Sequence, residues 1–205
     1  MSDTKIKNKN DSSIKRLTGI AIFSAIIVLL QLFATFVKFG PFSITLALIP
    51  IVVGAAVYGI RTGAFLGGVF GVVVLAACIF GWDVGGNILW NVNPLLTAVL
   101  CIVKGAAAGL LAGMVYVLLA KKNFLAGAIL AAVICPITNT GIFCLAMVLF
   151  YNDTLTAWAA GTPALSYIIF GLVGVNFIIE FSINVILSPI IARILKIRAK
   201  IYRSI

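Results

Sequence analysis

The sequence predicts an all-α integral membrane protein, a bundle of six transmembrane helices with both termini in the cytoplasm. Three observations predict it: the composition, the number of long apolar runs and the placement of the cations. Of the 205 residues, 63% are hydrophobic and 10% are charged, and the mean hydropathy is +1.23. A soluble domain is about half apolar and about a quarter charged, so this composition indicates a chain that lies in lipid.

Six apolar runs define the elements, because a helix needs about 20 apolar residues to cross the hydrocarbon core. They cover residues 17–37, 42–59, 62–80, 94–120, 123–151 and 164–194. The second run is short and contains Pro50, so five crossings with a re-entrant segment are the alternative. Residues 1–16 are expected to form a disordered cytoplasmic tail, residues 17–195 the membrane domain and residues 196–205 a basic cytoplasmic tail. The first run is too long for a signal peptide and should remain as a membrane helix.

The cations predict the orientation, because Lys and Arg near helix ends are retained on the cytoplasmic side. With the N-terminus inside, Lys38 is the one cation of an outer connection and Lys104 lies within a span. The other thirteen of the fifteen Lys and Arg residues then all lie in the cytoplasm, and six crossings return the C-terminus there. Anionic lipid headgroups attract such cations, so we expect the basic ends to anchor the chain.

Several functions lack the residues that they need. The chain has no His, and each of its four Cys residues lies in an apolar run, so neither a zinc site nor a disulfide framework is expected. No phosphate-binding loop, metal-ligand cluster or nucleophile–base pair is present in the sequence. We therefore expect no enzymatic activity and no cofactor.

Rows of small residues at four-residue spacing indicate where helices pack, because helices in lipid approach closely through small side chains. The glycine rows are expected to hold the bundle together. The alanine pair lies on a helix that otherwise carries bulky residues, so it is equally a candidate docking face for another membrane protein. The rows are Gly63, Gly67 and Gly71; Gly105, Gly109 and Gly113; and Ala21 and Ala25.

Polar side chains at membrane depth are costly and mark functional groups or internal pairs. At about 1.5 Å per residue, Lys104 lies about 15 Å from the outer end of its span, and Asn176 lies at a similar depth. Glu180 follows Asn176 at a four-residue step. Lys104 and Glu180 either neutralise each other or leave Lys104 available for a ligand carboxylate or phosphate, with Asn176 adding a hydrogen bond.

The outer half of the predicted bundle also carries candidate ligand groups. A loop over residues 81–94 is expected to contribute Trp82, Asn87, Trp90 and Asn91, although Trp also favours the membrane interface without any ligand. A second polar cluster, in the outer third of the fifth span, follows Pro136 and contains Thr138, Asn139 and Thr140. Spans one to three look nearly featureless. We therefore expect the ligand in the outer half, among spans four to six and beneath the loop.

Four segments resemble the substrate-binding S component of an energy-coupling factor (ECF) vitamin transporter. They are residues 18–25, which hold the alanine pair, residues 44–50 running into Gly54, residues 58–67 and residues 136–143. The resemblance covers nearly the whole chain after residue 16. It implies a bacterial cell-membrane protein that binds a vitamin or related micronutrient from outside. It also implies a transmembrane coupling (T) subunit, which contacts Ala21 and Ala25, and two cytoplasmic ATPases.

The substrate and two other functional classes stay open at this point. Lys104 favours pantothenate, whose carboxylate it could meet, but riboflavin, folate and a pyridoxine-like compound are alternatives. A secondary transporter would need membrane carboxylates or His and often an internal repeat, whereas this chain has one such carboxylate, Glu180. A non-transporting scaffold is the remaining alternative, and it would carry no ligand.

Overall fold

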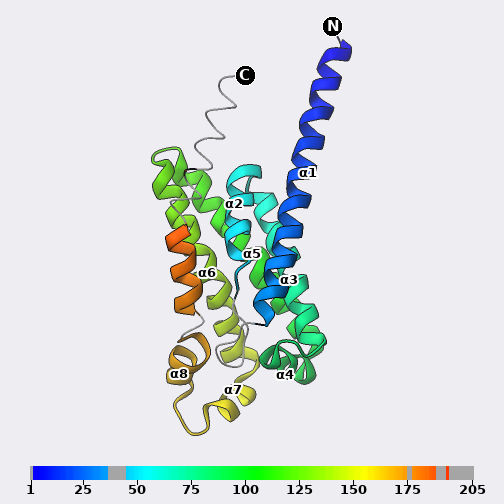
Figure 1. Ribbon diagram of the computed structural model, residues 1–205. Coiled ribbons are helices and arrows are strands. Elements are labelled where there is room, and N and C mark those ends of the chain that lie inside the picture. Colours follow the sequence, from blue (N-terminus) through cyan, green and yellow to red (C-terminus); the bar gives the residue numbers. More distant parts are fainter. Residues whose placement is uncertain (1, 37–44, 175–176, 188–192, 194–205) are drawn as a thin grey trace.

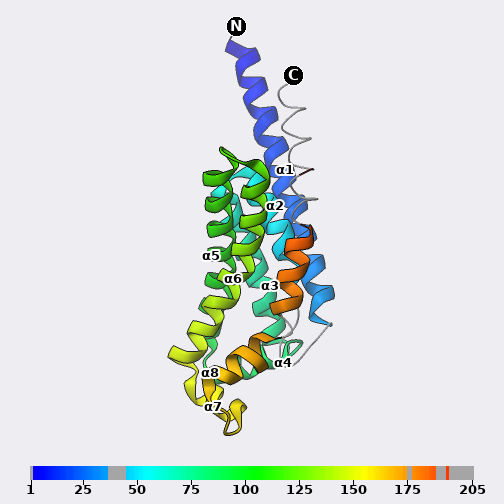
Figure 2. The ribbon, with the colours of Figure 1, turned by 90° about the vertical axis from the view of Figure 1, so that its left-hand side faces the viewer.

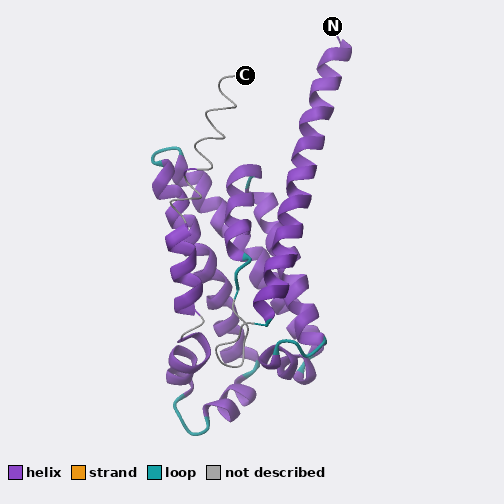
Figure 3. Ribbon diagram, viewed as in Figure 1, coloured by secondary structure: helices purple, strands orange, loops and turns teal. Residues whose placement is uncertain are grey.

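The computed structural model describes residues 2–36, 45–174, 177–187 and 193, and these residues form helices and no strand (Figure 3). The prediction of an all-α protein is therefore confirmed for this part of the chain. The elements are α1 (Ser2–Thr35), α2 (Leu48–Tyr58), α3 (Ile60–Ile79), α4 (Val84–Val92), α5 (Pro94–Ala120), α6 (Phe124–Phe150), α7 (Asn152–Ala159), α8 (Ala164–Tyr167), the π-helix Ile168–Val173 and the helix Phe177–Leu187.

Four helical segments are long and apolar enough to cross a membrane: Ser13–Thr35, Ile60–Ile79, Pro94–Ala120 and Phe124–Phe150. The other two predicted spans contain the shorter apolar helices Leu48–Tyr58 and Phe177–Leu187. The predicted sixth span is not one continuous α-helix. It begins with α8 and the π-helix Ile168–Val173, which ends at Gly174, and Gly171 packs directly against the ring of Tyr167.

Helix α2 shows why the second predicted span is shortened. Pro50 does not lie in its interior but in its first turn, where a missing N–H leaves no hydrogen bond unmade. The helix ends at Gly59, whose φ of +97° is open to glycine and strained for other residues. Its 11 residues reach about 16 Å, roughly half of the hydrocarbon core.

Two segments predicted to lack regular structure are helical. The N-terminal tail was expected to be disordered, but α1 begins at Ser2, because no Gly or Pro interrupts the chain before Gly19. The predicted loop over residues 81–94 contains α4. Asp83 caps this helix by accepting a hydrogen bond from Gly86 N at 2.7 Å, and Asn93 caps α5 by accepting one from Leu96 N at 3.1 Å.

The two glycine rows pack against each other, which confirms that they hold the bundle together. On α3, a Cβ atom placed on Gly63, Gly67 or Gly71 would overlap the backbone oxygen of Gly109, Gly105 or Cys101, respectively, on α5. Backbone therefore contacts backbone over at least two helical turns. This contact fixes α3 beside α5, and α6 follows α5 after the turn that Asn123 caps.

We expect Gly67→Ala to lower the stability of the folded protein by about 1–3 kcal/mol, the usual cost of overpacking. The added methyl group would lie 2.6 Å from the carbonyl carbon of Gly105. Gly68→Ala is the matched control, because a Cβ atom there meets nothing within 4 Å. Thermal unfolding of both variants in detergent measures the difference. Equal unfolding temperatures for the two variants would show that the glycine contact is not close.

The helices are arranged around a buried core, and most of the described connections lie at two opposite ends (Figures 1 and 2). The α2–α3 and α5–α6 junctions lie at one end, together with Arg16, Arg61, Lys121 and Lys122, and α4, α7 and α8 lie at the other. Arg16 of α1 donates a hydrogen bond to the carbonyl oxygen of Tyr58 at 3.2 Å, which ties α1 to the α2–α3 junction.

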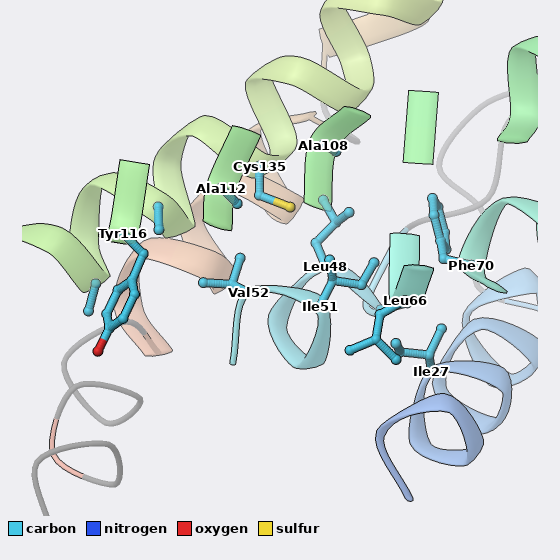
Figure 4. Close-up of a cluster of buried hydrophobic side chains, with 13 residues drawn as sticks. Ile27, Leu48, Ile51, Val52, Leu66, Phe70, Ala108, Ala112, Tyr116 and Cys135 are labelled. Atoms are coloured by element: carbon cyan, nitrogen blue, oxygen red, sulfur yellow. The ribbon is translucent and has the colours of Figure 1, made fainter. Parts of the chain in front are cut away.

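Two clusters of buried apolar side chains make up the core. The larger cluster joins α1, α2, α3, α5 and α6, and Figure 4 shows members such as Ile27, Ile51, Leu66, Phe70 and Cys135 converging on one another. The second cluster joins α4, α5, α6, α7 and the π-helix through residues that include Leu89, Leu100, Met147, Tyr151 and Leu155. Each cluster therefore holds the helices that it joins in a fixed position relative to one another.

Candidate functional site

A cavity of about 90 Å³ lies between the two apolar clusters. Its wall includes Val74, which packs against the larger cluster, and Leu89 and Leu100 of the smaller one. Side chains of α1, α3, α4, α5, α6 and the helix Phe177–Leu187 line it, together with Thr45 before α2. Six helices thus contribute to one mixed polar and apolar pocket, as in most small-molecule sites.

Four of the predicted ligand groups line this cavity: Lys104 of α5, Asn139 and Thr140 of α6, and Glu180 of the helix Phe177–Leu187. Lys104 and Glu180 form no ion pair. The Lys104 ammonium lies 5.3 Å from the centroid of the Phe143 ring, a cation–π contact. Glu180 is buried, and its Oε1 accepts a hydrogen bond from Thr45 N at 2.6 Å. Glu180 is thus held by the backbone, and the cation of Lys104 faces the cavity beside an aromatic ring.

The other predicted groups do not line the cavity. On α4, Asn87 donates to the carbonyl oxygen of Cys78 at 2.8 Å and Asn91 donates to that of Asn87 at 2.9 Å, while Trp90 is half-buried. Trp82 is exposed and its ring lies 5.3 Å from that of Phe80. On α6, Thr140 lines the cavity whereas the neighbouring Thr138 does not. Asn176 lies outside the described residues.

The first three predicted spans contribute more side chains to the cavity wall than the sequence indicated. Gln31 and Thr35 of α1 and Val74, Ala77 and Cys78 of α3 line the cavity, so the expectation that these spans are nearly featureless is wrong. Gln31 carried a signal in the sequence, because it is an amide within a long apolar run. The sequence gives no such indication for the α3 residues, since Val74, Ala77 and Cys78 look like ordinary packing residues.

Helix α4 covers the cavity at the end of the bundle opposite the basic junctions. Its N-cap Asp83 and its residues Gly86 and Leu89, spaced three residues apart, all line the cavity. Gly86 packs directly on Cys78 Sγ of α3, so a larger residue there would lift α4 from the bundle. The predicted loop over the site is therefore a short helix packed closely against α3.

The cavity wall contains charged side chains of both signs. Among the described lining residues, Lys104 is the one cation, and Asp83 and Glu180 are the carboxylates. Both carboxylates accept backbone N–H hydrogen bonds, Asp83 from Gly86 and Glu180 from Thr45. The described residues contain no group of three or more His, Cys, Asp or Glu that could hold a metal ion. Lys104 is therefore the described lining residue that could pair with a negative charge on a ligand.

The predicted docking residues lie away from the cavity. Ala21 and Ala25 are both exposed on α1, on a helix whose other exposed residues include Leu17, Ile22 and Leu29. The pair therefore forms a shallow strip of small side chains between bulky ones.

Comparison with known proteins identifies the family. Residues 15–192 match the family described as ECF transporter, substrate-specific component. The pantothenic acid transporter PanT of Lactococcus lactis subsp. cremoris is 31% identical over 183 residues, a match that covers 84% of this chain and 89% of that protein. The family match over residues 15–192 includes every residue that lines the cavity. The chain is therefore a member of the family of substrate-specific components of ECF transporters.

Proposed function

We propose that this chain is the substrate-binding subunit of an ECF-type transporter and that it captures pantothenate from outside a bacterial cell. The proposal depends above all on Lys104, a cation that lines the cavity without an ion pair to Glu180. It is supported by the similarity to a protein named as a pantothenic acid transporter. A T subunit and two cytoplasmic ATPases would drive uptake, with the chain as a multi-pass protein of the cell membrane.

The chemistry of pantothenate suits the composition of the cavity wall. The molecule has a carboxylate at one end, an amide in the middle and two hydroxyls beside a carbon that bears two methyl groups. In our proposal its carboxylate meets Lys104, and its methyl groups pack against apolar side chains such as Leu89, Leu100 and Phe143. A charged hydrogen bond in a low-dielectric site is stronger than one in water, so this contact would contribute a large share of the affinity.

We propose that the basic end of the bundle faces the cytoplasm and that the α4 end faces outward. The cations Arg16, Arg61, Lys121 and Lys122 all lie at the basic end, as expected for cytoplasmic junctions. The cavity is bounded by α4, so in this orientation the ligand would enter from outside. Six crossings, including the two shorter helices, remain part of this proposal.

Direct binding to the purified chain tests the proposed function. We expect calorimetry in detergent to show one pantothenate bound per chain, with no competition from riboflavin, folate or pyridoxine and no hydrolysis of ATP. If the chain prefers one of these other vitamins, that vitamin and not pantothenate is its substrate. Proton-coupled uptake by vesicles that contain this chain alone would instead make it a secondary transporter.

A further inference from the structure

Two buried amide groups on different helices of the cavity wall have carbonyl oxygens without a hydrogen-bond partner. They are Gln31 Oε1 of α1 and Asn139 Oδ1 of α6, and the two side chains are 3% and 5% exposed. Both residues line the cavity, and α1 and α6 lie on opposite sides of the bundle (Figure 1). Leaving a buried acceptor unpaired costs free energy, so each oxygen is a site at which a ligand donor would be stabilised.

A third unpartnered oxygen in the described part of the chain supplies a contrast. Asn184 Oδ1 is also buried without a partner, but Asn184 is not among the residues that line the cavity. Its Nδ2 donates to the carbonyl oxygen of Glu180 at 2.8 Å, which holds the side chain against its own helix. Asn184 therefore shares the burial of Gln31 and Asn139 but does not line the cavity.

We infer that Gln31 and Asn139 are specificity-determining residues that bind the hydrogen-bond-donating end of the ligand. This inference is an extension of the proposed function and depends on it. A carbonyl oxygen accepts hydrogen bonds and cannot donate them, so these two groups select hydroxyl or amide N–H donors. Pantothenate carries its hydroxyls at the end away from its carboxylate. The ligand therefore lies with its carboxylate toward Lys104 and its hydroxyls between α1 and α6.

The charges of the wall give this orientation a consequence for selectivity. Lys104 is the one cation among the described lining residues, and the remaining ionisable carboxyls are Asp83 and Glu180. A second negative charge at the donor end would face carbonyl oxygens and carboxylates without a compensating cation. Pantothenate phosphorylated on its terminal hydroxyl should consequently be excluded.

The test compares ligands and variants by calorimetry on the purified full-length chain. The ligands are pantothenate and an analogue in which both hydroxyls are replaced by hydrogen. We expect the wild-type chain to bind the analogue roughly 5–150-fold more weakly, the range for leaving a buried acceptor unsatisfied. Gln31→Met and Asn139→Leu should each weaken pantothenate binding and reduce this discrimination. Asn184→Leu, the matched control, should keep the discrimination of the wild-type chain.

The outcomes separate the inference from the function on which it depends. If the wild-type chain binds pantothenate and the analogue with equal affinity, the inference is wrong, whether or not any variant folds. Folded Gln31→Met and Asn139→Leu variants that discriminate as well as Asn184→Leu would also overturn it. If the wild-type chain binds no pantothenate at all, the proposed function fails and the inference fails with it.

Discussion

Replacing both Ala21 and Ala25 by Leu is expected to abolish pantothenate uptake by the assembled transporter and to leave pantothenate binding by the purified chain unchanged. Both alanines are exposed on α1 and neither lines the cavity. Close approach of two helices in lipid depends on small side chains at the contact, so two added isobutyl groups would keep a partner helix at a distance. Uptake in cells and calorimetry on the purified chain measure the two effects separately.

A matched control uses the neighbouring exposed residues of the same helix. Ile22→Leu combined with Ile26→Leu introduces the same residue type without adding volume, since both isoleucines are already bulky and exposed. This variant should retain uptake. An equal loss of binding and uptake in the Ala21 and Ala25 variant would mean that the pair holds the bundle together and is no docking face.

Lys104→Met should weaken pantothenate binding by roughly 10–150-fold, because a hydrogen bond to a charged group contributes about 1.5–3 kcal/mol. Met is unbranched and nearly as long as Lys, but it removes the ammonium that lies over the Phe143 ring. The control is a ligand in which the carboxylate of pantothenate is replaced by an alcohol. The wild-type chain should prefer pantothenate to this alcohol, and Lys104→Met should bind the two with similar affinity.

Two results would contradict this role of Lys104. If the wild-type chain binds the alcohol as tightly as pantothenate, no cation in the site contacts the ligand carboxylate. A folded Lys104→Met variant that still prefers pantothenate would place the carboxylate elsewhere in the cavity. The comparison of ligands on the wild-type chain needs no variant to fold, so it is informative by itself.

The fold was predictable where one physical signal was dominant. Long apolar runs predicted the bounds of α3, α5 and α6 to within two residues, and the four-residue spacing of glycines indicated the close contact of α3 with α5. The sequence was misleading where helix formation depends on packing. The segment that forms α4 is rich in Gly and Asn, which disfavour helices, but the Asp83 cap and the contact of Gly86 with Cys78 stabilise a helix there.

The sequence indicated the ionisable and some of the amide residues of the candidate site, but not the small and apolar residues that line the rest of the cavity. Lys104, Asn139 and Glu180 were recognisable because ionisable and amide groups are costly in lipid, and all three line the cavity. Asn87 and Asn91 looked equally suitable, but their amides bind the backbone of the α3–α4 region. Whether an amide faces a ligand or a carbonyl oxygen depends on the tertiary arrangement, which helical periodicity alone does not give.

Mass spectrometry of the small molecules that co-purify with the detergent-solubilised chain tests the central claim most directly. A ligand held by side chains from six helices should remain bound during purification if binding is tight. We predict that the protein from cells grown with pantothenate carries pantothenate in an amount close to one molecule per chain. Another vitamin in that amount, or protein that is folded and carries no small molecule even after incubation with pantothenate, would contradict the claim.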